Sequence, residues 1–114
     1  MKGSKAMKIN YNGIDYELVF NLNVMEEIQE KYGTVEKWLT VTDSDEEPKA
    51  KDLKFGFMAM INEGIDIYNE THEDQRAPFT SRQVGRVITE VGLQNIAETL
   101  NETVIESTKS DQKN

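Results

Sequence analysis

The sequence predicts a mainly α (α+β) fold, in which an N-terminal β-hairpin packs on a bundle of about four to five helices. Residues 7–20 alternate between apolar and polar side chains on either side of an Asn-Gly pair. The most apolar long segment, 53–68, has the periodicity of a helix, and other stretches with helical spacing lie on both sides of it. A chain of 114 residues is long enough for one domain with one modest core.

The predicted hairpin closes at Asn12-Gly13. Both residues tolerate the positive φ angles of a type I′ turn, which makes this pair the strongest short hairpin signal. On one face Lys8 meets Glu17, a favourable cross-strand pair. An isolated two-stranded ribbon is marginally stable in water, so helices must cover the other face. That face carries Met7, Ile9, Tyr11, Ile14, Tyr16 and Leu18.

Two shorter helices are expected after the hairpin. The first is capped by Asn21 or Asn23 and ends at Gly33. The second begins after Thr34 and carries the one tryptophan of the chain, Trp38. We interpret Trp38 as a core residue, and an anchor for a partner protein is the alternative.

The segment 41–51 is rich in acidic residues and is predicted to be a loop. It differs from a calcium-binding EF-hand loop because Pro48 stands where that motif needs glycine, and no glutamate closes it. We therefore expect a solvated acidic loop and no metal site.

The central helix presents apolar side chains over a wide arc, which is typical of a helix that contacts neighbours on several sides. Phe55 departs from this pattern because it projects onto the polar arc. Either Phe55 packs near the start of the helix, or it is an exposed aromatic that docks a partner or another copy of the chain. Gly64 lies on the apolar arc, where close approach of another backbone would explain it. Gly56 lies off that arc, and the sequence offers no reason for it.

The C-terminal part contains two apolar stripes that lie on opposite sides of a single straight helix. We therefore expect a break at Gly92, where the phase changes. Thr80 or Ser81 caps the first of these helices. Ile105 lies on the polar side of the second helix.

The expected organisation is a disordered lead (1–6), a single domain (7–107) that contains the acidic loop, and a disordered tail (108–114).

No constellation for catalysis, a cofactor or a metal is visible in the sequence. There is no cysteine, and the one histidine, His72, has no second histidine with which to share a metal. Glycine-rich phosphate loops and nucleophile motifs are absent. No apolar run approaches the ~20 residues needed to cross a bilayer. The net charge of −8 argues against binding to nucleic acid or to an anionic membrane. We expect a protein that is not an enzyme and has no cofactor.

A small basic cluster is expected near the start of the penultimate helix. Arg82 and Arg86 share a face that points away from the apolar stripe, and Arg76 precedes them. They are candidates for contact with an acidic partner, while pairing with Glu90 and Asp74 is the alternative. The candidate partner-binding residues are therefore Trp38, Phe55, Arg82, Arg86 and Ile105.

The layout resembles a known family. The opening hairpin, MKINYNGIDYELVF, runs directly into a helix that ends in Tyr-Gly, VMEEIQEKYG. The local motifs are G-x-x-Y-x-L from Gly13 to Leu18 and E-K-Y-G from Glu30 to Gly33. A short Trp-containing helix and further helices follow in a small acidic chain. This layout is similar to that of tail assembly chaperones of long-tailed (siphovirus-type) phages and prophages of Gram-positive bacteria.

The resemblance implies a non-enzymatic protein of the bacterial host cytoplasm. Such chaperones bind the tape-measure protein, keep it soluble and help to recruit the tail-tube protein. They are not retained in the mature virion, and they tend to self-associate, so a homo-oligomer is one expectation. The residues leave two alternatives open, a small acidic inhibitor that mimics DNA and a head–tail structural component.

Overall fold

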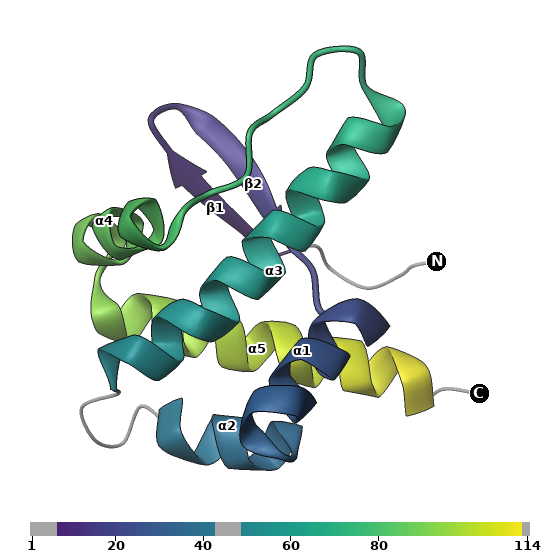
Figure 1. Cartoon of the computed structure of the whole chain (residues 1–114), viewed down its shortest axis with the longest axis vertical. Helices are drawn as coiled ribbons and strands as arrows, with labels where there is room; N and C mark the ends of the chain where they lie inside the picture. Colours follow the sequence, from purple (N-terminus) through teal and green to yellow (C-terminus); the bar gives the residue numbers. More distant parts are fainter. Residues whose placement is uncertain (1–6, 43–48, 113–114) are drawn as a thin grey trace.

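The computed structural model describes residues 7–42 and 49–112, and it confirms the mainly helical α+β class (Figure 1). An antiparallel hairpin is followed by five helices within these residues. The strands are β1 (Met7–Tyr11) and β2 (Ile14–Leu18). The helices are α1 (Leu22–Tyr32), α2 (Val35–Thr42), α3 (Ala50–Thr71), α4 (Ser81–Val91) and α5 (Leu93–Gln112).

Helix α3 is the centre of the fold, because it packs against β2 and against each of the other helices (Figure 1). The hairpin lies beside its C-terminal half, α2 lies toward the end where α3 begins, and α1 runs alongside α3 from Phe55 to Glu63 (Figure 1). Its fully buried side chains include Leu53, Phe57, Met60 and Ile61. The wide apolar arc of this segment is therefore explained by neighbours on several sides.

The hairpin has the predicted register, in which Lys8 pairs with Glu17. Asn12 and Gly13 have φ angles of 55° and 79°, as a type I′ turn requires. A Cβ on Gly64 would overlap the carbonyl oxygen of Glu17, so this glycine allows the backbone of β2 to approach α3. The expectation of a close backbone approach at Gly64 is confirmed.

The buried side of α2 explains the other glycine of α3, Gly56. Trp38 is fully buried, and its indole Nε1 donates a hydrogen bond to the carbonyl oxygen of Asp52 at 3.0 Å. A Cβ on Gly56 would come within 2.6 Å of Cε2 of the Trp38 ring. Gly56 is therefore required by the packing of the indole. Trp38 belongs to the core, and its alternative interpretation as a surface anchor is wrong.

Most helix ends lie where the capping residues predict them. Asn21 accepts a hydrogen bond from the N–H of Val24, and Thr80 forms a capping box with Gln83. The chain breaks between α4 and α5 at Gly92, with a φ of 111°.

Two boundaries differ from the prediction. The loop predicted at 41–51 is shorter, because α2 continues to Thr42 and α3 begins at Ala50, and its acidic residues 43–48 lie outside the described part. Helix α5 continues to Gln112, so the predicted disordered tail 108–114 begins too early. No glycine or proline interrupts the helical hydrogen bonds in this stretch. The predicted lead, 1–6, also lies outside the described residues.

Candidate partner-binding site

Two adjoining hollows form a groove between α1 and α3. Their volumes are about 360 and 160 Å³, and both are lined by Phe55 and Glu27. The floor consists of the half-buried side chains of Phe55, Met58 and Ala59. Spacing of i, i+3 and i+4 brings these three residues to one face of α3. The rim is polar and mostly acidic, and it is formed by Glu27, Glu30, Lys31, Asn62, Glu63 and Asp66.

Phe55 is partly buried. It is therefore neither fully packed near the start of the helix nor fully exposed, which were the two positions expected from the sequence. Its ring packs edge-on against Tyr32, with the ring centroids 5.7 Å apart. The ammonium nitrogen of Lys31 lies 5.1 Å from the centre of the Phe55 ring. Tyr32 is itself held by a hydrogen bond of 2.6 Å that its hydroxyl donates to Asp52. Burial and this bond raise the pKa of Tyr32, which keeps the phenol protonated.

The acidic rim brings like charges together. Glu63 accepts hydrogen bonds from the side-chain amides of Asn21 and Asn23, at 2.8 and 3.1 Å, which fix its carboxylate beside α1. Burial, followed by the nearby charges of Glu63, Glu26 and Glu30, raises the pKa of Glu27. The ionised form of Glu27 is therefore disfavoured by its surroundings, and a positive charge from outside would stabilise it.

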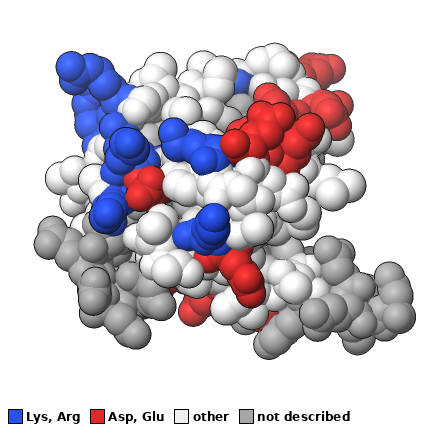
Figure 2. All heavy atoms as spheres, turned by 60° about the horizontal axis from the view of Figure 1, so that its bottom comes forward, with Lys and Arg blue, Asp and Glu red and all other residues white. Residues whose placement is uncertain are grey.

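The basic residues of α4 lie in a different hollow. Arg82 and Arg86 line a shallow depression together with Lys54 and Glu90. Arg76 points toward the hairpin and Tyr68, so the predicted cluster of three arginines is not formed. The third basic side chain of the depression is Lys54 of α3. On the face shown in Figure 2, most Lys and Arg side chains lie on the left and in the centre, the largest group of Asp and Glu lies at upper right, and further acids lie below the centre.

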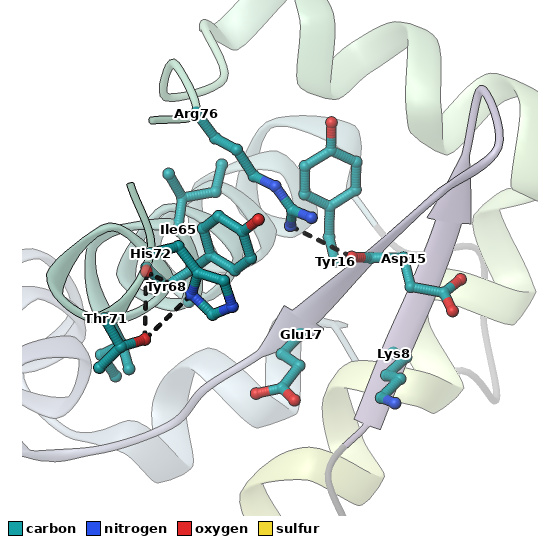
Figure 3. Close-up of a pocket in the computed structure, with 11 residues that line it drawn as sticks. Lys8, Asp15, Tyr16, Glu17, Ile65, Tyr68, Thr71, His72 and Arg76 are labelled. Atoms are coloured by element: carbon teal, nitrogen blue, oxygen red, sulfur yellow. Dashed lines mark hydrogen bonds between the residues drawn. The ribbon is translucent and has the colours of Figure 1, made fainter. Parts of the chain in front are cut away.

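A fourth hollow, of about 400 Å³, lies between the hairpin and the C-terminal end of α3 (Figure 3). The Arg76 guanidinium lies 3.7 Å from the centre of the Tyr68 ring, and it donates a hydrogen bond to the carbonyl oxygen of Asp15 at 3.3 Å. The His72 ring stacks on Tyr68 at 3.7 Å and 6°. Two groups this close to the ring centre cannot share one face, so Arg76 and His72 lie on opposite faces of Tyr68.

The stack belongs to a larger set of contacts that fixes the segment between α3 and α4. Asn69 donates to the carbonyl of Arg76 and accepts from its N–H, at 3.0 and 2.9 Å. Asn62, two turns earlier on the same face of α3, does the same with Phe79, at 3.0 and 2.8 Å. Side-chain amides thus satisfy the backbone of this connection. Neither these two asparagines nor this role of Arg76 is recognisable from the sequence, and we assign all three a structural function.

Ile105 and Leu22 are single exposed apolar side chains that lie apart from these hollows. Ile105 is 47% exposed, as its position on the polar side of α5 predicts. Leu22, at the first position of α1, is 77% exposed and was not singled out from the sequence. Within the described residues no group of three or more His, Cys, Asp or Glu side chains is arranged to hold a metal ion. None of the described helices is long and apolar enough to cross a membrane.

Comparisons with protein-family models, with curated proteins and with solved structures find no match for this chain. Of the candidate residues, Phe55 lies in the groove, Arg82 and Arg86 line the basic depression, and Ile105 stands apart from both.

Proposed function

We propose that this protein is a tail assembly chaperone of a long-tailed phage or prophage of Gram-positive bacteria. It binds the tape-measure protein in the host cytoplasm, keeps it soluble, helps to recruit the tail-tube protein and is not retained in the virion. The observation that carries the proposal is the groove between α1 and α3, with its half-buried apolar floor. The order of hairpin, Tyr-Gly-terminated helix and Trp-containing helix supports it.

The proposed activity requires binding and no chemical step. A tape-measure protein is long and helical, and its apolar stretches need cover until the tail tube surrounds them. A groove between two helices receives such a stretch in the helix-in-groove mode, through apolar residues spaced along one face of the bound helix. Phe55 and Met58 supply apolar contact area, and the unbranched thioether of Met58 adapts to different side chains.

Co-expression tests this function. The tape-measure protein is produced alone, with this protein, and with its Phe55→Ala variant, and the soluble fraction and pulldown yield are measured. We expect solubility only with the chaperone, and less of it with the variant. A tape-measure protein that stays insoluble and unbound, although this protein is folded, would refute the proposal.

A further inference from the structure

We infer that the α1–α3 groove selects an amphipathic helix of about three turns whose apolar stripe is flanked by lysine or arginine. The inference deepens the proposed function and depends on it for the source of the helix, a segment of the tape-measure protein. The groove itself supplies the length, the apolar stripe and the sign of the charges.

The length of the groove sets the length of the helix. The residues of α3 that line it run from Phe55 to Asp66. Roughly eleven steps of 1.5 Å give about 16 Å, or three helical turns. The apolar floor occupies the first part of this distance, at Phe55, Met58 and Ala59. Carboxylates of α1 and, farther along α3, those of Glu63 and Asp66 line the same hollows. The bound helix therefore places its apolar side chains on the floor and its flanking side chains at the rim.

The rim selects the charge of those flanking side chains. Glu27 shares the groove with Glu30 and Glu63, so carboxylates of like charge lie close together in the free protein. Burial, and after it this repulsion, raises the pKa of Glu27. Lysine or arginine at the edges of a bound helix replaces this repulsion by attraction. A helix flanked by glutamate or aspartate would increase the repulsion.

Lys31 shows that a cation fits in this place. Its ammonium lies 5.1 Å from the centre of the Phe55 ring, and it shares the hollow with Glu27 and Glu30. This arrangement combines a cation–π contact with nearby carboxylates. Lys31 is exposed, so its long side chain is free to move aside for a partner's lysine or arginine.

A second copy of the chain fits the groove less well. The basic surface of α4 has the required charge, but the hollow there is lined by Lys54, Gly85, Thr89 and charged side chains of α4. It carries no large apolar side chain to cover Phe55 and Met58. Charge complementarity together with an apolar stripe therefore favours a helix of the partner protein.

Peptide binding to the full chain tests the inference without the tape-measure protein. The probes are three fluorescent helical peptides of about 18 residues, or five turns. One has a leucine stripe flanked by lysine, one has glutamate at the flanking positions, and one has the first composition with the stripe scrambled. Anisotropy titration should show binding of the lysine-flanked peptide, with at least about tenfold weaker binding of the other two.

Variants locate the site. Phe55→Ala should weaken binding of the lysine-flanked peptide about tenfold, and Glu27→Gln with Glu63→Gln should weaken it several-fold. Ile67→Ala and Glu90→Gln are matched controls, because Ile67 is an exposed apolar residue of α3 and Glu90 an acid of α4, both outside the groove. Both controls should bind as the wild type does.

Three results would overturn the inference: equal binding of the lysine- and glutamate-flanked peptides, folded groove variants that bind normally, or groove variants that change only self-association in sedimentation. The last would assign the groove to a second copy. Failure of the proposed function is distinguishable. If the peptide binds but the tape-measure protein is not kept soluble, the proposed chaperone function is refuted and the inference about the groove stands. If the groove variants still keep the tape-measure protein soluble, only the inference about the groove is refuted.

Discussion

Gly64 and Gly85 are two helical glycines with opposite surroundings. A Cβ on Gly64 would overlap the carbonyl oxygen of Glu17 and lie 3.1 Å from its carbonyl carbon, both backbone atoms of β2. A Cβ on Gly85 would meet only the end of the Lys54 side chain, at 3.6 Å. Substitution of each by alanine therefore tests how closely β2 approaches α3, because the helical preference for alanine is common to both variants.

The expected magnitudes follow from these contacts. Alanine is preferred over glycine inside a helix by about 1 kcal/mol, so Gly85→Ala should raise the free energy of unfolding by up to ~1 kcal/mol. At Gly64, overpacking costs about 1–3 kcal/mol. Displacing β2 also loses the 3.2 Å hydrogen bond from the N–H of Val19 to the carbonyl of Met60, worth about 1 kcal/mol. The net expectation for Gly64→Ala is a loss of about 1–3 kcal/mol.

Denaturant unfolding measures both variants, followed by the fluorescence of Trp38, which is the one tryptophan and is fully buried. The two substitutions should change the free energy of unfolding in opposite directions. If Gly64→Ala proves as stable as Gly85→Ala, the hairpin does not lie against the backbone of α3, and the reasoning fails.

Two further predictions concern the core and the acidic rim. Gly56→Ala should be destabilising in the wild type, and it should cost less in a Trp38→Phe background, where part of the ring is gone. A double-mutant cycle, with unfolding followed by circular dichroism, measures this coupling. Strictly additive effects on the free energy of unfolding would contradict the contact. Because burial and neighbouring carboxylates raise the pKa of Glu27, the folded state binds a proton more tightly than the unfolded state. The ionised Glu27 therefore lowers the free energy of unfolding, and this effect develops as the pH rises above the usual pKa of 4.5. Glu27→Gln should stabilise the fold at about pH 7 and lose this effect below about pH 4, and a gain independent of pH would refute the electrostatic cause.

The predictions that succeeded depended on local geometry. The Asn12-Gly13 turn fixes the hairpin register because the side-chain period of a strand is two. Gly92 was identified by a change in helical phase, which also depends only on neighbouring residues. Gly64 could be anticipated because its position on the apolar arc already indicated a close neighbour.

The features that the sequence did not predict depend on tertiary contacts. Arg76 does not join Arg82 and Arg86, because Asn69 binds its backbone and Tyr68 its guanidinium, which direct it toward the hairpin. Gly56 had no explanation from the sequence, because its reason is the ring of Trp38 on another helix. Neither partner is recognisable from residue type or spacing. The position of Phe55 against Tyr32 likewise depends on how α1 crosses α3.

The acidic rim resolves a conflict that an apolar binding groove creates. A protein that covers exposed apolar helices must itself present apolar surface, and such surface promotes association of its own copies. Here Phe55 and Met58 lie in hollows whose rim is mostly acidic, so two copies that meet groove to groove bring like charges together. The same carboxylates favour a helix that carries lysine or arginine. Repulsion between copies and attraction to the partner thus come from one set of residues, which is how specificity is obtained when apolar contact alone does not discriminate.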